Sequence, residues 1–406
     1  MVLEKLIKYN FYLLILLPIA LISGPLIPDL IVVTSCILIF FYFKNHSLKI
    51  SNNKFVIALA LLWLVSVISS IFSKDILFSL KSSFFYFRII IFTLVINIIF
   101  KIYEKDLYKI LNVLLLIFLV LFVDSTFQKF YGYNLIGIVS THSARISSFF
   151  GDELILGSYL VKFYPILVAF LYLIKSSRFL IYFLIFSVIT FVAIFFSAEK
   201  AAIIIFLIEF LSITFLIKTN IKTKILVILS FIILFLLMFL SFPKVKNRIY
   251  DQLIANSANF KYLYTRIHTE HYISGLKIFN DYPLIGIGTK MFRMHCNNTE
   301  YKISEFSCST HPHNYSVQML AETGIFGFIF FIYFYFLLIK DFFHLALNNN
   351  NNKYKFPLYS LLILNLMNFM PLFPSGNFFN NWVSINYAFG LGVYFYLREK
   401  YEEHLI

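Results

Sequence analysis

The side chains best suited to catalysis are concentrated in one short stretch of the chain. Residues 310–322 read THPHNYSVQMLAE, and the two histidines, His311 and His313, flank a proline. Pro312 disfavours helix at His311 and is well tolerated in a first helical turn, so we expect a helix to begin near His313 and Asn314. Free backbone N–H groups and the helix dipole favour anions at such a position. A neutral imidazole there could take a proton from a hydroxyl group.

Glu322 lies inside the apolar segment that follows. Its spacing from Tyr315 and Gln318 places three polar side chains on one helix face. A charged glutamate near the centre of a membrane costs about 2.5–3.5 kcal/mol on insertion scales, so it usually faces a partner or a wet cavity. Either His313 caps a helix while Gln318 and Glu322 tie helices together, or these residues form a substrate site. We expect no metal, because no carboxylate or cysteine stands at ligand spacing beside the two histidines.

Two further polar groups interrupt the apolar sequence. Residues 141–160, THSARISSFFGDELILGSYL, carry Arg145 and Glu153, and residues 197–202, SAEKAA, carry Lys200. Each group also has a purely structural explanation. An arginine beside a membrane surface is often a headgroup anchor, an acidic residue at a helix start complements the dipole, and the SAEK turn could hold a surface ion pair.

A fourth polar group is YLYTRIHTEHY, residues 262–272, which carries Arg266 together with two histidines and a glutamate. Its structural explanation is an amphipathic helix in a loop. The four groups need a scaffold that brings them together, and the rest of the sequence indicates which kind.

The composition is that of an integral membrane protein. Hydrophobic residues make up 60% of the 406 residues and charged residues only 13%, whereas soluble domains have about 25% charged residues. A spanning helix needs roughly 17–25 mostly apolar residues. Segments of this kind lie near 7–23, 29–43, 55–73, 83–100, 107–124, 154–174, 179–197, 200–217, 224–242, 317–340, 356–371 and 380–397. We therefore predict an all-α polytopic membrane protein of about twelve transmembrane helices, with residues 1–406 forming a single membrane domain.

The distribution of basic residues predicts the orientation. With the N-terminus inside, the short inner loops hold eighteen basic residues and the short outer loops hold three, Lys74, Lys81 and Lys200. Such a bias places both termini in the cytoplasm. The net charge of +14 is then explained by inner loops facing anionic membrane lipids, and nucleic acid is not needed as a partner.

Two long loops, 125–153 and 243–316, fall on the outer side in this topology, and all four polar groups lie at that side. Arginines there, against the usual bias, suggest an anionic ligand, for which a diphosphate fits because guanidinium binds phosphate in a bidentate manner. Cys296 and Cys308 lie in the second loop. They either pair in an oxidising compartment or remain free thiols. Cys36 is expected in a membrane helix.

Taken together, these stretches resemble the O-antigen ligase family. HPHNYSVQMLAETGIFGF resembles its histidine–asparagine motif, and DSTFQKFYGYNLIG (124–137), RISSFFGDELILGSYL (145–160), SAEKAA and DYPLIGIGTKMF (281–292) resemble its other signatures in the same order. The tail MPLFPSGNFFNNW (370–382) also fits. The resemblance implies a GT-C-like bundle of about twelve helices with a partly helical periplasmic loop, in the bacterial inner membrane, with its active face in the periplasm.

The resemblance also implies a chemistry. Such enzymes transfer a glycan from an undecaprenyl-diphosphate carrier to an acceptor sugar, which for ligases belongs to lipid A–core, with inversion and without a metal or cofactor. The essential histidine of the family corresponds to His313, and its essential arginines correspond best to Arg145 and Arg266. Lys200 stands where related sequences often carry arginine. We predict further substrate contacts from His311, Asn314, Glu322, Glu153 and Lys200, and a sugar path along Asn377, Asn380, Asn381 and Trp382, for which a membrane-interface belt is the alternative.

Three other functions stay open. A glycan polymerase would use the same donor with a second lipid-linked chain as acceptor. A protein O-oligosaccharyltransferase is less expected, since no sizeable domain follows the last apolar segment. A flippase for lipid-linked sugars or another transporter should show internal repeats and polar residues near mid-membrane. Here the polar groups gather at one face. Convergence of His313, Arg145 and Arg266 on one cavity would favour the transferase.

Overall fold

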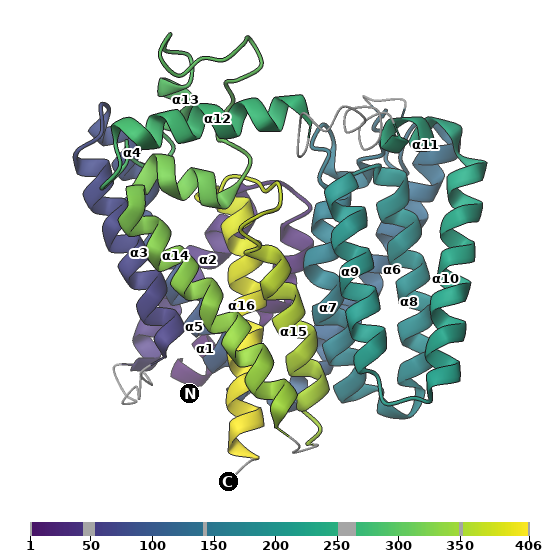
Figure 1. The fold of residues 1–406 in the computed structure, drawn as a ribbon. Coiled ribbons are helices and arrows are strands. Elements are labelled where there is room, and N and C mark those ends of the chain that lie inside the picture. Colours follow the sequence, from purple (N-terminus) through teal and green to yellow (C-terminus); the bar gives the residue numbers. More distant parts are fainter. Residues whose placement is uncertain (1, 44–52, 141–143, 251–264, 349–351, 405–406) are drawn as a thin grey trace.

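The computed structural model describes residues 2–43, 53–140, 144–250, 265–348 and 352–404. Within these ranges the chain forms helices and turns, with one isolated bridge between Tyr133 and Val139 and no strand. The all-α prediction is confirmed. Figure 1 shows most helices running roughly side by side as a bundle, while α12 lies across one end of it.

Twelve helices coincide with the twelve apolar segments predicted from the sequence. They are α1 (Val2–Ala20), α2 (Leu26–Phe43), α3 (Lys54–Ile71), α5 (Phe87–Ile102), α6 (Tyr108–Tyr131), α7 (Leu156–Ile174), α8 (Phe179–Ser197), α9 (Lys200–Leu216), α10 (Ile221–Ser241), α14 (Tyr315–Leu347), α15 (Lys355–Asn368) and α16 (Asn381–Glu403). The remaining α-helices are α4 (Ile76–Ser83), α11 (Pro243–Tyr250), α12 (Arg266–Asp281) and α13 (Phe292–His295). The second long loop is thus partly helical.

Seven helical segments among the described residues are long and apolar enough to cross a membrane. Others of the twelve fall short by length, since α9 has 17 residues and α15 has 14. The protein is therefore a multi-pass, all-α membrane protein, and the number of twelve spans stays a prediction.

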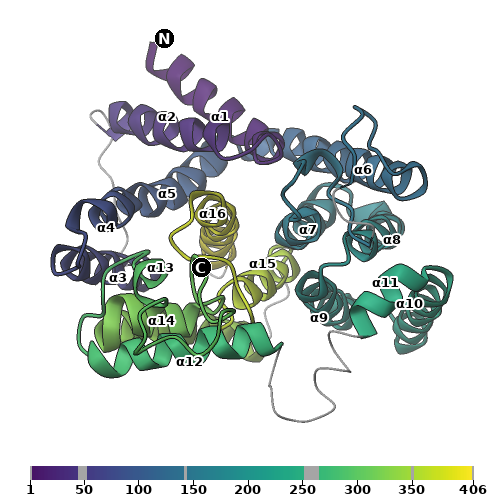
Figure 2. The ribbon, with the colours of Figure 1, turned by 90° about the horizontal axis from the view of Figure 1, so that it is seen from above.

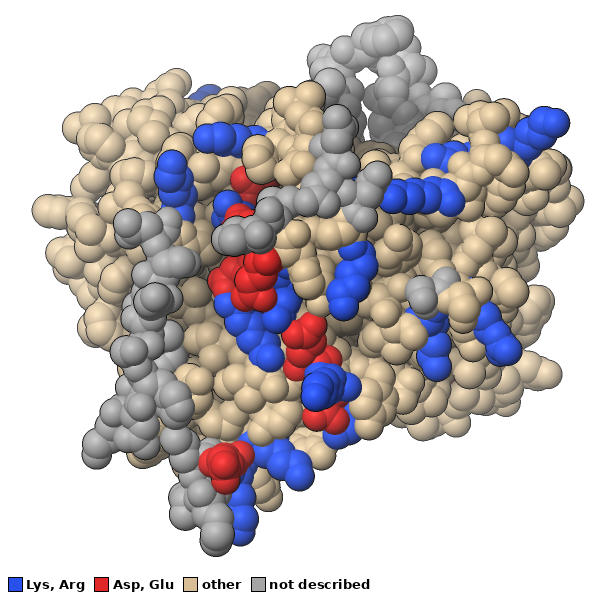
Figure 3. All heavy atoms as spheres, turned by 90° about the horizontal axis from the view of Figure 1, so that it is seen from below, with Lys and Arg blue, Asp and Glu red and all other residues tan. Residues whose placement is uncertain are grey.

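Both chain termini lie at the end of the bundle opposite to α12 (Figure 1). Seen from that end, basic side chains are spread over the face and acidic side chains gather near its middle (Figure 3). Among the described residues three ion pairs join the last turns of α16 to this end, Lys400 with Glu104 at 2.9 Å, Arg398 with Asp341 at 3.1 Å, and Glu399 with Lys101. The relative placement of loop and termini agrees with the predicted topology, and which end faces the cytoplasm stays a prediction.

The helix α16 forms the centre of the bundle. Residues 384–397 are all buried, as expected for a helix that has neighbours on every side. Figure 2 shows α16 and α15 in the middle, with α1–α5 and α14 on one side and α6–α10 on the other. The two groups of helices are thus held together by the last two.

Two elements differ from the sequence-based expectation. The segment 317–340 is not one uninterrupted helix, because α14 is broken at Gly324, whose φ of 65° and ψ of −166° are not helical. In addition, α6 continues to Tyr131 and ends at Gly132 with φ 84°, so the first long loop is shorter than 125–153. Gly132 supplies the left-handed C-cap of the helix, and the carboxylate of Asp124 accepts hydrogen bonds from the N–H of Leu135 (2.8 Å) and from the hydroxyl of Ser148 (2.5 Å) in the loop that follows.

Candidate functional site

His313 lies directly before α14, as the sequence predicted. Asn314 is the N-cap of this helix, and its side-chain oxygen accepts a hydrogen bond from the N–H of Val317 at 3.0 Å. Its amide nitrogen donates to the carbonyl oxygen of Pro371 at 3.0 Å. Asn314 therefore fixes the start of α14 against the loop before α16.

The backbone of His313 is held in an unusual conformation. Its φ is 56°, in the left-handed region that residues other than glycine seldom occupy. Its carbonyl oxygen accepts a hydrogen bond from the N–H of Ser375 at 2.9 Å, and its Nε2 lies 3.2 Å from the hydroxyl of Ser309. Such strain persists only where surrounding contacts fix it, and it is common in binding and catalytic sites.

Three imidazole rings gather around that of His313. Its ring centroid lies 4.0 Å from that of His311, 5.2 Å from that of His271 and 5.5 Å from that of His268. Burial, and then the neighbouring imidazoles, lower the pKa of His313 to about 3. Burial likewise lowers the pKa of His268 and His311 to about 4. The cluster is therefore neutral near pH 7, and its rings can accept protons. Among the described residues no group of His, Cys, Asp and Glu is arranged to hold a metal ion.

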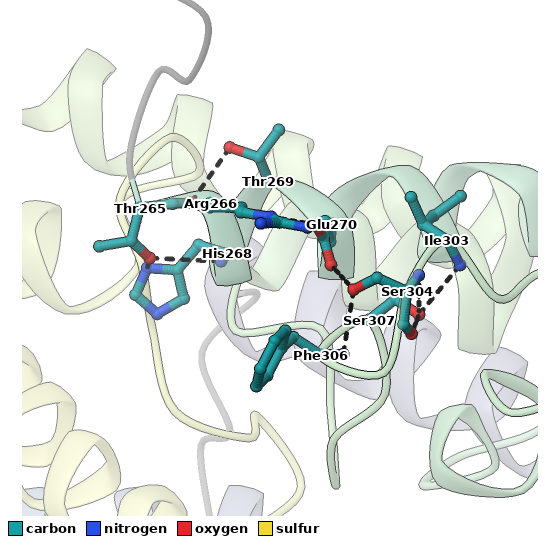
Figure 4. A network of polar contacts seen from close by, with 9 residues as sticks. All are labelled: Thr265, Arg266, His268, Thr269, Glu270, Ile303, Ser304, Phe306 and Ser307. Carbon is teal, nitrogen blue, oxygen red and sulfur yellow. Dashed lines mark hydrogen bonds and ion pairs between the residues drawn. The ribbon is translucent and has the colours of Figure 1, made fainter. Parts of the chain in front are cut away.

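Arg266 stands in the first turn of α12. Figure 4 shows its guanidinium directed along the helix toward Glu270, with Nε 2.8 Å from the carboxylate oxygen. Glu270 also accepts a hydrogen bond from Ser304. Thr265 caps the helix, because its hydroxyl accepts from the N–H of His268 at 3.3 Å. Arg266 is thus placed on the same helix as His268 and His271, with a side chain that is 57% exposed.

A cavity of about 1140 Å³ opens beside this cluster. Of the residues predicted for the site, His311, His313 and Glu153 line it, as do the four residues of the proposed sugar path, Asn377, Asn380, Asn381 and Trp382. Its cationic lining consists of Lys81, Lys162, Lys290 and Arg293. Its acidic lining consists of Glu153 and Glu209. The charged residues of the lining therefore carry an excess of positive charge, on walls that are otherwise largely apolar.

Arg145, Arg266 and Lys200 are not lining residues of this cavity, so the expected convergence of His313, Arg145 and Arg266 on one cavity is not observed. Arg145 and Lys200 instead surround the SAEK turn. Arg145 donates from Nη2 to the carbonyl oxygen of Leu154 at 2.8 Å and from Nε to that of Ser197 at 3.4 Å. Arg248 of α11 donates to the carbonyl oxygen of Ala198 at 3.5 Å. The charges of Arg145 and Arg248 both act on Lys200, and the charge of Lys200 acts on His268. These three cations form the α9-side basic group, next to the histidine cluster.

The carboxylate of Glu199 fixes the SAEK turn by accepting hydrogen bonds from α7, rather than by an ion pair with Lys200. Its Oε1 accepts from the N–H of Gly157 at 2.7 Å, and its Oε2 accepts from the N–H of Ser158 at 3.1 Å. An anion at the start of α7 satisfies free N–H groups and complements the helix dipole. A β-carbon on Gly157 would lie 2.6 Å from the hydroxyl of Ser197, so the turn needs glycine at this position.

Glu322 is fully buried and is not a lining residue of the cavity. Its carboxylate accepts hydrogen bonds from the side chain of Gln318 at 2.9 Å and from the N–H of Phe292 at 3.3 Å, and its carbonyl oxygen accepts from the N–H of Gly288 at 3.0 Å. Gln318 in turn donates to Asn377 at 3.0 Å. Glu322 thus connects α14 to the DYPLIGIG segment and to the loop before α16.

A disulfide joins Cys296 and Cys308, whose Cα atoms are 5.1 Å apart. It closes the segment between α13 and the HPH stretch. Cys36 is a buried free cysteine in α2, as expected.

Several features of the site could not be derived from the sequence. His268 and His271 belong to the YLYTRIHTEHY group, but their contact with His313 forms only in three dimensions, since some forty residues separate them in the chain. Lys290 lies inside the DYPLIGIGTKMF motif and Arg293 directly after it, and neither position indicates that the residue lines a cavity. Glu209, inside an apolar helix, was passed over; it is fully buried, and both its carboxylate oxygens lack a partner among the described residues. An acidic residue inside an apolar segment was the available signal.

The fold and the cavity define a multi-pass membrane protein with a cationic, histidine-bearing site at one end of its bundle. Residues 166–332 match the family model described as O-antigen ligase. The match confirms the family predicted from the motifs: the chain contains a domain of the O-antigen ligase family. It spans from α7 into α14 and so includes His313, Arg266 and Lys200, whereas Arg145 lies before it. No curated protein sequence matches the chain. The family supports glycan transfer of the ligase or polymerase type, in lipopolysaccharide biosynthesis.

Proposed function

We propose that the protein transfers a glycan from an undecaprenyl-diphosphate carrier to a sugar hydroxyl of lipid A–core, at the periplasmic face of the bacterial inner membrane. The observation that carries this proposal is His313, a neutral imidazole on a strained backbone, at the wall of a cationic cavity of about 1140 Å³. A base, a cavity and surrounding cations are the parts that glycosyl transfer from a diphosphate needs.

His313 acts as the general base. The acceptor oxygen attacks the anomeric carbon of the donor while its proton passes to the imidazole, and the bond from that carbon to the diphosphate breaks with its electron pair leaving on the diphosphate. A base with a pKa near 3 is weak in the empty site. A bound diphosphate stabilises the imidazolium form and so raises this pKa toward the operating pH.

The donor diphosphate is bound by Arg145 and Arg266, with Lys200 beside them. Arg145 uses Nε and Nη2 for the carbonyl oxygens of Ser197 and Leu154, which orients the guanidinium, and a guanidinium has five N–H donors in all. The positive charge of Arg145 acts on Lys200, and that of Lys200 acts on His268 of the histidine cluster. Fixed cations at this position stabilise the charge that develops on the leaving group.

The cavity favours a transferase over a transporter of lipid-linked sugars. Its histidines come from the loop before α14, and three of its cations, Lys81, Lys290 and Arg293, come from α4, the loop before α13 and α13 itself. The helices α4 and α13 lie at the end of the bundle that carries α12 (Figure 1). A transport site is expected near the middle of the bundle, at the interface of repeats. A polymerase would use the same site with a lipid-linked acceptor.

Transfer by purified protein in detergent tests the proposal, with carrier-linked glycan as donor and lipid A–core as acceptor. His313→Ala should reduce the rate by about 10²–10⁴, the usual effect of losing a general base. His404→Ala, at the exposed end of α16, is the matched control and should retain the rate. Near-normal transfer by His313→Ala rules out the base. Product formed only with a second carrier-linked glycan as acceptor would identify a polymerase.

The proposed orientation has its own measurement. Leu284 is 61% exposed at the α12 end and Leu347 is 82% exposed at the last turn of α14. In intact spheroplasts, a membrane-impermeant maleimide should label Leu284→Cys and leave Leu347→Cys unlabelled. The native thiols do not interfere, because Cys36 is buried and the other two are paired. The reverse labelling pattern would place the cavity in the cytoplasm.

A further inference from the structure

Three cations of the cavity, Lys81, Lys290 and Arg293, form a group apart from Arg145 and Lys200; we call it the α4-side basic group. All three line the cavity together with His311 and His313. None of the ion pairs between described residues includes any of the three. A cavity with several uncompensated cations favours an anionic ligand.

The positions of these cations are fixed by the backbone. Lys290 has φ 60°, and the N–H groups on either side of it are anchored on Glu322, that of Gly288 at its carbonyl oxygen (3.0 Å) and that of Phe292 at its carboxylate (3.3 Å). Lys290 is thus held by the same buried glutamate that connects the loops of the cavity. A site held in this way needs little reorganisation to bind its ligand.

Arg293 packs on an aromatic ring and retains an unused hydrogen-bond donor. Its guanidinium carbon lies 5.8 Å from the ring centroid of Phe78, and its buried Nε has no hydrogen-bond partner in the described structure. Burial, and then the charge of Arg293, lower the pKa of Lys290. The two cations destabilise each other until an anion binds between them.

The two basic groups stand on opposite sides of the histidine cluster. Figure 2 shows α4 and α13 on one side of the molecule and α9 and α11 on the other, and α12, which carries His268 and His271, lies on the α4 side with one end near the middle. In an inverting transfer the attacking hydroxyl and the leaving diphosphate lie on opposite faces of the anomeric carbon. Only one basic group can therefore bind the diphosphate, and the other lies on the acceptor side.

We propose that Lys81, Lys290 and Arg293 bind an anionic substituent of the acceptor glycan, a phosphate or a carboxylate near the hydroxyl that is glycosylated. The inference rests on the proposed function, which assigns the donor diphosphate to Arg145 and Arg266, with Lys200 beside them. The α4-side group then selects a negatively charged acceptor and holds its hydroxyl beside His313. Neutral acceptors of the same sugar sequence bind less well.

Steady-state transfer tests the assignment with Lys290→Gln, Arg293→Gln and their combination. The KM for lipid A–core should rise about tenfold or more, the loss expected for one charge-assisted hydrogen bond, while the KM for the carrier-linked donor stays within twofold. Lys277→Gln is the matched control, because Lys277 lies on α12, contacts the carbonyl oxygen of Glu300 and is not a lining residue. A rise in the donor KM instead would assign these cations to the diphosphate and overturn the proposal.

The acceptor is then altered in place of the protein. If the anion is a phosphate, the acceptor KM of the wild-type protein should rise by the same factor when lipid A–core is dephosphorylated with hydrofluoric acid. If the anion is a carboxylate, the same rise should follow reduction of the carboxyl group. The acceptor KM of the double variant should not change with the treatment that raises the acceptor KM of the wild type. If neither treatment changes the wild-type KM, the proposal is wrong.

Direct binding separates this inference from the proposed function. Binding of lipid A–core to the protein in nanodiscs needs no turnover, so it can be measured even if no transfer is found. Weaker binding by the double variant and by Lys81→Gln, whose exposed side chain is safe for folding, supports the acceptor site even where the transfer assay fails. Equal binding by wild type and variants overturns it.

Discussion

The carbonyl oxygen of Leu284 lies 2.2 Å from the position that a β-carbon on Gly324 would occupy. The backbone of the DYPLIGIG segment thus packs directly on the break in α14, with no side chain between them. Gly286 makes the reciprocal contact, since a β-carbon there would lie 2.5 Å from the carbonyl carbon of Glu322. The N–H of Ile325 donates to the carbonyl oxygen of Pro283 at 2.8 Å. This contact sets the position of Lys290 and Arg293 at the cavity.

Replacing Gly324 by alanine should therefore destabilise the protein strongly. The substitution adds an overlap of the kind that costs about 1–3 kcal/mol to a backbone conformation, φ 65° and ψ −166°, that costs about 1–3 kcal/mol for a residue with a β-carbon. Gly151→Ala is the matched control, because its φ of 64° and ψ of −124° are similar but no atom lies within 4 Å of the added carbon. Thermal unfolding in detergent should show the larger drop in Tm for Gly324→Ala. Equal drops would mean that the contact with Leu284 relaxes without cost.

The sequence predicted the helices well because apolar runs of spanning length are a local signal. It also placed His313 and Asn314 correctly, since proline and an N-cap residue act within a few positions. It did not predict the break at Gly324, because the break depends on the approach of Leu284, forty residues away. For the same reason it missed the contact of His268 and His271 with His313, which only the fold brings about.

The predicted basic residues illustrate the same limit. Lys200 and Arg145 were found because cations on the outer side are unusual, and the structure brings them to one turn. Lys162 was not found, because a lysine inside an apolar helix gives no hint that its ammonium lies 5.5 Å from the ring centroid of Trp382, at the wall of a cavity. The carboxylate of Glu199 was interpreted from its neighbour Lys200, whereas its partners are the N–H groups of another helix.

Arg145→Lys should impair transfer even though the charge is retained. The present side chain donates from two nitrogens to the carbonyl oxygens of Leu154 and Ser197, and an ammonium group cannot hold both and also bind phosphate in a bidentate manner. We expect the donor KM to rise about tenfold, in the range for one charge-assisted hydrogen bond, with the acceptor KM unchanged. Lys200→Arg is the comparison, because it adds a guanidinium to the same turn and should keep or lower the donor KM. An unchanged donor KM in Arg145→Lys would remove this residue from the diphosphate site.

The histidine cluster should make the stability of the protein sensitive to acid. Burial lowers the pKa of His311 and His268 to about 4 and that of His313 to about 3, whereas an unfolded chain has histidine pKa values near 6.5. Below pH 6.5 the unfolded state binds more protons than the folded state, so stability falls as pH decreases. The full stability is present above pH about 6.5, and the loss continues until pH about 3, the pKa of His313 in the folded state.

Substitution of His311 by asparagine tests the predicted loss of stability at low pH, because the His311 side chain is 8% exposed and its Nε2 has no partner among the described residues. Between pH 7.5 and pH 5, the Tm of the wild type should fall more than the Tm of His311→Asn, since the variant has one less buried imidazole to protonate. His404→Asn, which removes an exposed imidazole at the far end of α16, should follow the wild type. If all three proteins lose the same number of degrees, His311 titrates alike in the folded and unfolded states, and the cluster is wetter than its burial indicates. The low pKa of His313, on which the proposed neutral base depends, would then have to be caused by the charges of neighbouring groups and not by burial.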